Sequence, residues 1–99
     1  MSVTKRTTPR PEVFAALDAE RLFQLRRGGR ETLPPSGHHE VADWLDFMDR
    51  LLSAARCQVA DSPDPAVAEQ ALHAVRRITA MGVACMEQHG VPARHRWPG

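Results

Sequence analysis

The stretch HHEVADWLDFMDRLLSAAR, His38 to Arg56, decides the fold class of this chain. Its apolar residues recur at spacings of three and four, which is the period of an α-helix and leaves no alternating pattern for a strand. Continued slightly beyond the stretch, the apolar positions are Val41, Trp44, Leu45, Met48, Leu51, Leu52, Ala55 and Val59. We therefore predict a helix over residues 38–60, with the first six of these residues facing the core.

Turn residues on either side of this stretch predict two more helices. The first, residues 11–27, begins with a proline and stops before a Gly-Gly pair. The last, residues 65–89, begins with a proline behind Asp64 and stops before Gly90. Proline is tolerated in a first helical turn, aspartate caps helix starts and glycine ends helices. The chain is therefore predicted to be all-α, with three helices over about 11–27, 38–60 and 65–89.

The length of 99 residues indicates a single domain. We assign residues 11–90 to this helical bundle domain, and expect residues 1–10 to form a flexible N-terminal arm and residues 91–99 a C-terminal tail. A Pro-Pro linker precedes the middle helix, where Ser36 or Gly37 is the predicted cap.

The third predicted helix is too long and too apolar for a monomer of this size. Twenty-five residues at 1.5 Å each give roughly 37 Å, which exceeds the expected diameter of so small a compact domain. Residues 78–86 are apolar or small on every side, and such a helix must be buried all round. We therefore expect a homo-oligomeric bundle, most simply a twofold dimer with Gly82 at a close helix crossing.

The composition is that of an ordinary globular protein, with 42% hydrophobic residues, 25% charged residues and a formal net charge of +1. Near-neutral charge argues against general nucleic-acid binding. No stretch approaches the roughly 20 apolar residues that span a bilayer, and the N-terminus lacks a secretory apolar segment. We therefore expect a cytoplasmic protein with no membrane partner, in which Cys57 and Cys85 are free, buried thiols.

A histidine-rich and acidic group lies at the start of the middle helix and consists of His38, His39, Glu40, Asp43 and Asp46. Positions 39, 43 and 46 share one helix face, so their side chains can converge. Zinc prefers four ligands with Cys or His prominent, and magnesium prefers several oxygens. Neither set is complete locally. A metal site at Glu40 and Asp43 and a solvated face that complements the helix dipole both remain open.

Four arginines are candidate ligands for a phosphate group: Arg26, Arg27, Arg76 and Arg77. The guanidinium group presents a fork of donors that matches phosphate oxygens. The alternative is that Arg76 and Arg77 only solvate the outer face of the third helix. Motifs of other catalytic classes are absent, including G-x-S-x-G, a Gly-rich phosphate loop and H-E-x-x-H.

Two segments carry a resemblance to a known family: HHEVADWLDFMDRLLSAAR and the later ALHAVRRITAMGVACMEQHGVPAR, Ala71 to Arg94. They resemble small helical proteins of bacteriophages and prophages, which in turn resemble the MazG-type all-α nucleotide pyrophosphohydrolases. In the MazG-type enzymes, an E-x-x-E pair and an E-x-x-D pair on successive helices hold magnesium against a nucleoside triphosphate. Because Glu40 and Asp43 match the E-x-x-D spacing, the resemblance implies that these two residues bind magnesium.

The chain departs from the family pattern because a second pair of acids is missing. Asp18 and Glu20 have the wrong spacing, and Arg76 and Arg77 stand where the third helix would need an acid. A single carboxylate pair cannot hold the two or more cations of that mechanism. What the resemblance implies is therefore phosphate recognition without efficient hydrolysis.

The leading functional prediction is a non-catalytic, phage-type protein that binds a nucleotide or another phosphate ligand in a cleft between subunits. The residues predicted to line this cleft are His39, Glu40, Asp43, Arg76 and Arg77. One alternative is a protein-binding module, such as a phage-encoded inhibitor of a host enzyme or defence complex. A second alternative is a weak magnesium-dependent nucleotide pyrophosphohydrolase.

Overall fold

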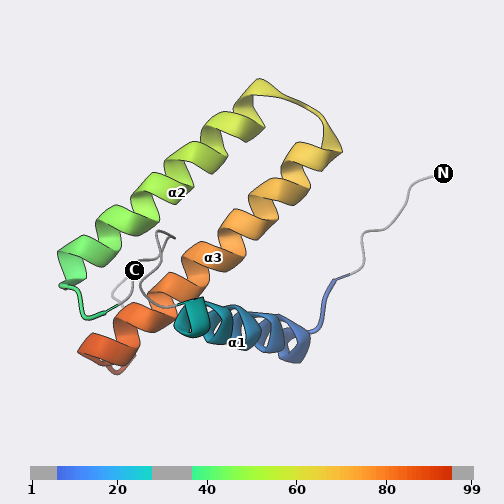
Figure 1. The fold of residues 1–99 in the computed structure, drawn as a ribbon. Coiled ribbons are helices and arrows are strands. Elements are labelled where there is room, and N and C mark those ends of the chain that lie inside the picture. Colours follow the sequence, from blue (N-terminus) through green and yellow to red (C-terminus); the bar gives the residue numbers. More distant parts are fainter. Residues whose placement is uncertain (1–6, 28–36, 95–99) are drawn as a thin grey trace.

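Three α-helices make up the ordered framework of this computed structural model, which describes residues 7–27 and 37–94. They are α1 (Arg10–Arg27), α2 (Val41–Asp61) and α3 (Pro65–His89), and no strand occurs within those ranges. Figure 1 shows α2 and α3 side by side as an antiparallel hairpin, with α1 lying across α3. The prediction of an all-α, three-helix chain is confirmed.

The bounds of α3 agree with the predicted range of residues 65–89, because both of its caps form. The Asp64 side chain accepts a hydrogen bond from the backbone N–H of Ala66 at 2.9 Å, and Pro65 occupies the first turn. At the other end, Gly90 has a φ of +98° and its N–H donates to the carbonyl of Met86 at 2.8 Å. A positive φ is readily adopted only by glycine, so the helix ends there.

The helix α2 begins three residues later than predicted, and its cap is Glu40 rather than Ser36 or Gly37. Glu40 has an extended backbone, and its N–H donates to the Asp43 carboxylate at 3.2 Å as part of a capping box. His38 and His39 therefore precede the helix instead of belonging to it. Gly37, which is described, has a φ of +92° and lies outside any helix.

The core of the hairpin is small and lies between α2 and α3. Trp44, Met81 and Ala84 are at most 2% exposed. The partly buried residues packed against them are Phe47, Met48, Leu51 and Cys85. Cys85 is thus half-buried as a free thiol, whereas Cys57 is exposed, so the prediction of a buried thiol is wrong for Cys57. Among the described helices, α2 contacts α3 and not α1, so a single neighbouring helix covers part of its surface.

The predicted core face of α2 is also partly wrong. Val41, Leu45 and Leu52 are 45%, 58% and 45% exposed, while Phe47, which was not predicted to face the core, packs on it. The reason is that α2 contacts α3 but not α1 in the described chain. One neighbour covers only part of the wide apolar sector of α2, and the rest stays on the surface.

The long α3 is buried on two sides but not all round. Ala80, Met81 and Ala84 are buried, whereas Met86 is exposed. The structure is that of a single chain, so the oligomer predicted to cover the exposed part of α3 stays a prediction. None of the helices in the described ranges combines the length and apolar character needed to span a bilayer. Most of the predicted arm and tail, namely residues 1–6 and 95–99, and the linker 28–36 lie outside the described residues.

Candidate functional site

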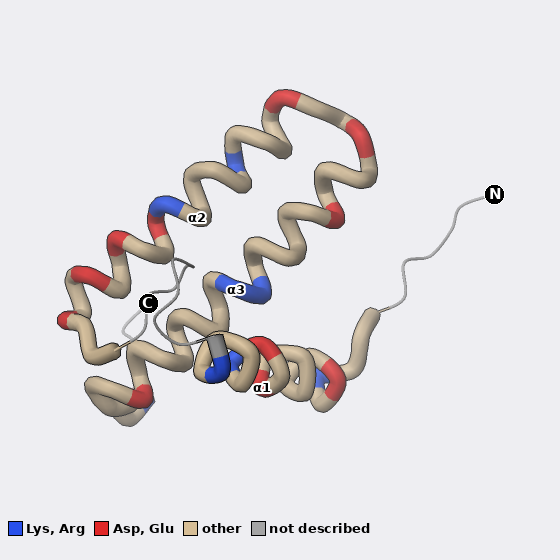
Figure 2. Tube along the Cα trace, viewed as in Figure 1, with Lys and Arg blue, Asp and Glu red and all other residues tan. Residues whose placement is uncertain are grey.

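The acidic residues predicted to bind a ligand stand at the N-terminus of α2. Glu40 and Asp43 are exposed, and one Asp43 carboxylate oxygen accepts the backbone N–H of Glu40. Capping by a carboxylate satisfies a free N–H and complements the positive end of the helix dipole. Asp46 and Asp49 are also exposed on the same helix, and Figure 2 shows several acidic positions along the first half of α2. This arrangement has a structural role as it stands and leaves carboxylate oxygens open to solvent.

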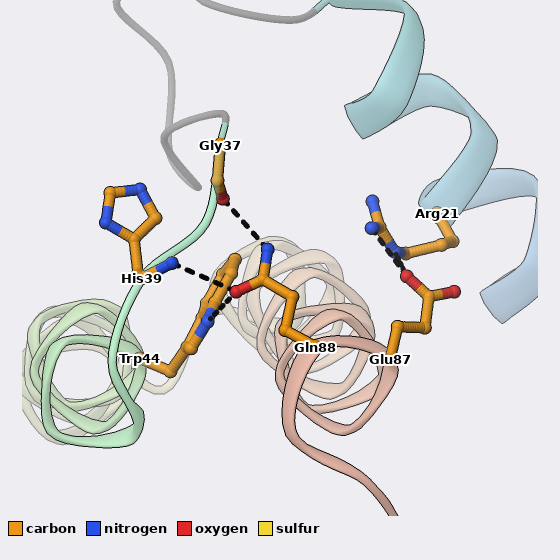
Figure 3. Close-up of polar contacts among 6 residues, drawn as sticks. All are labelled: Arg21, Gly37, His39, Trp44, Glu87 and Gln88. Carbon is orange, nitrogen blue, oxygen red and sulfur yellow. Dashed lines mark hydrogen bonds and ion pairs between the residues drawn. The ribbon is translucent and has the colours of Figure 1, made fainter.

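The segment before α2 is tied to the end of α3 through one side chain, Gln88. Its Oε1 accepts hydrogen bonds from the His39 backbone N–H at 3.0 Å and from Trp44 Nε1 at 2.9 Å. Its Nε2 donates to the Gly37 carbonyl at 2.8 Å. Figure 3 shows Gln88 reaching from α3 between these three partners. Both ends of the amide are therefore satisfied, and Trp44 is buried with its indole N–H paired.

The three histidines near this anchor make ring contacts and a backbone contact. The rings of His38 and His89 have centroids 5.0 Å apart, and His39 packs edge-on against Trp44 and Phe47. The Nε2 of His89 lies 2.6 Å from the His39 carbonyl, to which it donates a hydrogen bond. Histidines in this group thus close the open end of the hairpin by packing and hydrogen bonding.

The arginines predicted to bind phosphate are placed in the middle of α3. Arg76 Nε donates to Glu20 Oε1 at 2.9 Å, which joins α3 to α1. The Glu20 side chain is only 9% exposed, whereas that of Arg76 is 38% exposed. A carboxylate in that position needs its counterion, because an unpaired buried charge is costly. Arg76 therefore does more than solvate the outer face of α3.

The remaining predicted phosphate ligands contribute less to a site within one chain. Arg77 is half-buried and already engaged in a contact, Arg26 is exposed, and the side chain of Arg27 lies outside the described residues. A second ion pair between the same two helices joins Arg21 and Glu87 at 2.6 Å. The pairing of acids and bases across α1 and α3 indicates a structural use for these charges.

The predicted acidic and basic ligands are not brought together within one chain. The anchor of the acidic group is Gln88, and Arg76 precedes it by twelve residues on the same helix. Twelve residues at 1.5 Å each separate them by roughly 18 Å along α3. A nucleotide phosphate group cannot contact both. Within residues 7–27 and 37–94 no group of three or more His, Cys, Asp or Glu residues is placed to hold a metal ion.

A different surface emerges on the hairpin, where exposed or half-buried side chains form two apolar rows. The α2 seam consists of Val41, Leu45, Met48, Leu52, Ala55 and Val59, and the α3 seam of Ala68, Leu72, Val75, Thr79, Gly82 and Met86. In both rows the spacing alternates between four and three residues. This is the heptad spacing with which a helix packs along another helix.

The two seams meet at a groove between α2 and α3, which is lined by three residues of the α2 seam and by Val75 of the α3 seam. The groove has a volume of about 370 Å³. Its α2 wall consists of Leu52, Ala55, Arg56, Val59 and Ala60, and its α3 wall of Ala71, Val75 and Ile78. A second groove of about 400 Å³ lies between α1 and α3, and its lining includes Leu72, Val75 and Thr79. The α3 seam is thus a ridge between two apolar grooves. We call the α2 and α3 seams with their shared groove the paired seam face.

Sequence reasoning missed both the structural role of Gln88 and the exposure of this face. A glutamine near a helix end carries no local pattern that reveals its three partners. The seams did leave a trace, because Val41, Leu45, Met48, Leu52, Ala55 and Val59 keep strict alternating spacing over the whole of α2. A helix with such a seam and also an inward Trp44 and Phe47 has apolar surface for two neighbours.

Comparison with known proteins found no match: no family model, no curated protein and no solved structure matches the chain. The resemblance to the MazG-type enzymes and to phage proteins therefore stays a prediction.

Proposed function

We propose that the chain is a protein-binding module that presents the paired seam face to another helical surface. The observation that carries this proposal is the presence of two heptad-spaced, mostly apolar rows of exposed or half-buried residues that meet at the groove of the α2–α3 hairpin. Contiguous apolar surface of this kind is unfavourable in water and is typical of binding sites for proteins. Two parallel rows are the surface into which the ridges of partner helices pack.

The charges of the chain support the same proposal. None of the twelve seam residues is charged, and the lining of their shared groove adds a single charged side chain, Arg56, so covering this surface desolvates few ionised groups. The acidic residues Asp43, Asp46 and Asp49 lie outside both seams and remain exposed. An apolar centre with charged residues outside it resembles the anatomy of protein interfaces.

The proposal is tested by the native size of a tagged chain in an extract of cells that express it. We expect the chain to migrate as part of a larger assembly, and the substitution pair Leu52→Glu and Leu72→Glu to reduce it to single-chain size. The matched control is Leu25→Glu on α1, since Leu25 is 58% exposed and Leu72 is 68% exposed. Migration of the unmodified chain at single-chain size would overturn the proposal.

A second candidate function is the binding of a magnesium-bound nucleotide or other phosphate ligand. Its support is the pairing of two exposed carboxylates, Glu40 and Asp43, at the spacing that the resemblance to MazG-type enzymes implies. Magnesium would neutralise phosphate charge between them. Arg76 is engaged by Glu20 and lies far along α3, so a site of this kind draws its cationic ligands from another chain.

The second candidate is tested by calorimetric titration of the unmodified chain with nucleoside triphosphates, with and without magnesium. We expect magnesium-dependent heat that is lost in Asp43→Asn and kept in Asp49→Asn, which changes an exposed aspartate on the same helix. Absence of heat with every nucleotide would rule it out. Release of pyrophosphate in the same samples would instead favour the weak hydrolase.

A further inference from the structure

We infer that the occupant of the paired seam face is a second copy of this chain, so that two α2–α3 hairpins form a twofold four-helix bundle. This inference rests on the proposed function, since it names the partner of the same surface. Four observations lead to it: the width of the apolar sector on α2, the size of the face, the match between its two seams and the open space at Gly82.

The first observation is that α2 carries apolar residues for two neighbours but contacts one. Trp44, Phe47 and Leu51 face α3, and the α2 seam borders them on one side. In a four-helix bundle each helix packs against two others around a common core, which requires such a wide sector. The chain supplies two of the four helices, and a second copy supplies the other two.

The second observation is the size of the face. Each seam spans nineteen residues, from Val41 to Val59 and from Ala68 to Met86, or roughly 28 Å at 1.5 Å per residue. Two helices packed side by side are about 20 Å wide. The face therefore measures on the order of 600 Å² per chain, or 1,200 Å² for a pair, which reaches the lower limit of stable interfaces.

The third observation is that the two seams complement each other in side-chain volume. The α2 seam is bulky, with Leu45, Met48 and Leu52 at its centre, whereas small residues interrupt the α3 seam at Ala68, Thr79 and Gly82. Cores pack densely when large residues face small ones. A twofold axis places the α2 seam of one chain against the α3 seam of the other, so one surface serves both partners.

The fourth observation concerns the backbone at Gly82. A Cβ built there meets no atom of the described residues within 4 Å, so no contact among residues 7–27 and 37–94 requires a glycine. Glycine in a helix interior costs about 1 kcal/mol relative to alanine. Close approach of a second helix gives this residue a role, because absence of a side chain lets two helix backbones come together.

The test is the molar mass of the purified chain by sedimentation equilibrium over a wide range of concentrations. We expect twice the chain mass of 11.0 kDa, dissociation on dilution, and single-chain mass for the Leu52→Glu and Leu72→Glu pair. The Leu25→Glu control on α1 should keep the double mass. A single-chain mass of the unmodified protein at every concentration would overturn the inference.

A second measurement does not depend on whether the glutamate variants fold. In the unmodified chain, the methyl groups of Met86 and Met81 are labelled with carbon-13 and exposed to a soluble paramagnetic reagent. Met86 is exposed and Met81 is buried in the single chain. Protection of Met86 close to that of Met81 supports the dimer, and strong attenuation of the Met86 signal contradicts it.

The two proposals fail in different ways. A purified chain of single-chain mass that migrates as a larger assembly in extract would reject the second copy as the partner but keep the protein-binding function. A single-chain size in both experiments would reject both. A mass larger than two chains would reject the twofold bundle and indicate a different assembly.

Discussion

Gln88 shows how one side chain can set the geometry of a whole hairpin. Its amide pairs with the backbone of Gly37 and His39 and with the indole of Trp44. These bonds fix where the chain turns into α2, and they hold Trp44 toward α3. The rotation of α2 that follows leaves Leu45 and Leu52 on the surface. The polar contacts at this end of the hairpin thus accompany the helix rotation that leaves these apolar residues exposed.

Replacing Gln88 by Met should lower the free energy of unfolding by about 2 kcal/mol, since the buried indole N–H loses its acceptor. The measurement is urea unfolding at fixed chain concentration, followed by Trp44 fluorescence in a Trp97→Phe background. The control is Gln70→Met, at an exposed glutamine of the same helix, with an expected change within about 0.5 kcal/mol. Equal losses in the two variants would show that the three hydrogen bonds of Gln88 are not stabilising.

The helices themselves are delimited by short-range capping contacts. Asp64 caps α3 through the Ala66 N–H, and Asp43 completes the capping box of α2. Three residues before Asp64, Asp61 ends α2, where a negative charge opposes the helix dipole. The two aspartates of this turn therefore have opposite effects on the helices that they border.

This contrast predicts that Asp64→Ala lowers the free energy of unfolding by about 1 kcal/mol, because α3 loses the acceptor of its N-cap. The Asp61→Ala variant is the matched control and should leave stability unchanged or raise it by a few tenths of a kcal/mol. Both are measured by urea unfolding followed by circular dichroism. Loss of stability in Asp61→Ala that equals the loss in Asp64→Ala would contradict the capping argument.

At the scale of the whole molecule, the three described helices leave many large apolar side chains exposed. The α1 helix contacts α3 alone, where the Arg76 and Glu20 pair and the Arg21 and Glu87 pair join the two helices. Within residues 7–27 and 37–94, no third helix packs along both the α2 and the α3 seam. The four-helix bundle that we propose covers the paired seam face and explains the length of α3.

The bundle predicts that the effect of Gly82→Ala depends on assembly. In the monomeric background of Leu52→Glu and Leu72→Glu, alanine should raise the free energy of unfolding by about 1 kcal/mol, because the space is open and helix propensity improves. In the dimer-forming chain the gain should shrink or reverse, since the added methyl group meets the second helix. Urea unfolding of the four variants measures this coupling.

The control for this cycle is Gly90→Ala, at the C-cap of α3. Its φ of +98° strains any other residue, so the substitution should be destabilising by about 1 kcal/mol in both backgrounds. An identical gain from Gly82→Ala in the two backgrounds would place Gly82 outside the interface.

Much of the fold could be predicted from local patterns, whereas little of the candidate site could. The α3 bounds followed from Asp64, Pro65 and Gly90, whose effects act within one turn. The predicted ligands Glu40 and Asp43 do lie together. Residues three positions apart at the start of a helix are neighbours in any fold. Arg76 lies apart from them, since a distance between different helices depends on how those helices pack.

The number and order of the three helices and the bounds of α3 thus depended on capping residues and apolar spacing, and the sequence alone was sufficient to predict them; the start of α2 at Val41 was not predicted. The face of α2 that turns inward was decided only in the tertiary structure. Its apolar sector was wide enough for two neighbours, so periodicity did not distinguish Phe47 from Leu45 as the core residue. Packing against α3 made that choice and placed Trp44 in hydrogen-bond contact with Gln88, 44 residues away in the chain, because a contact between different helices depends on how those helices pack.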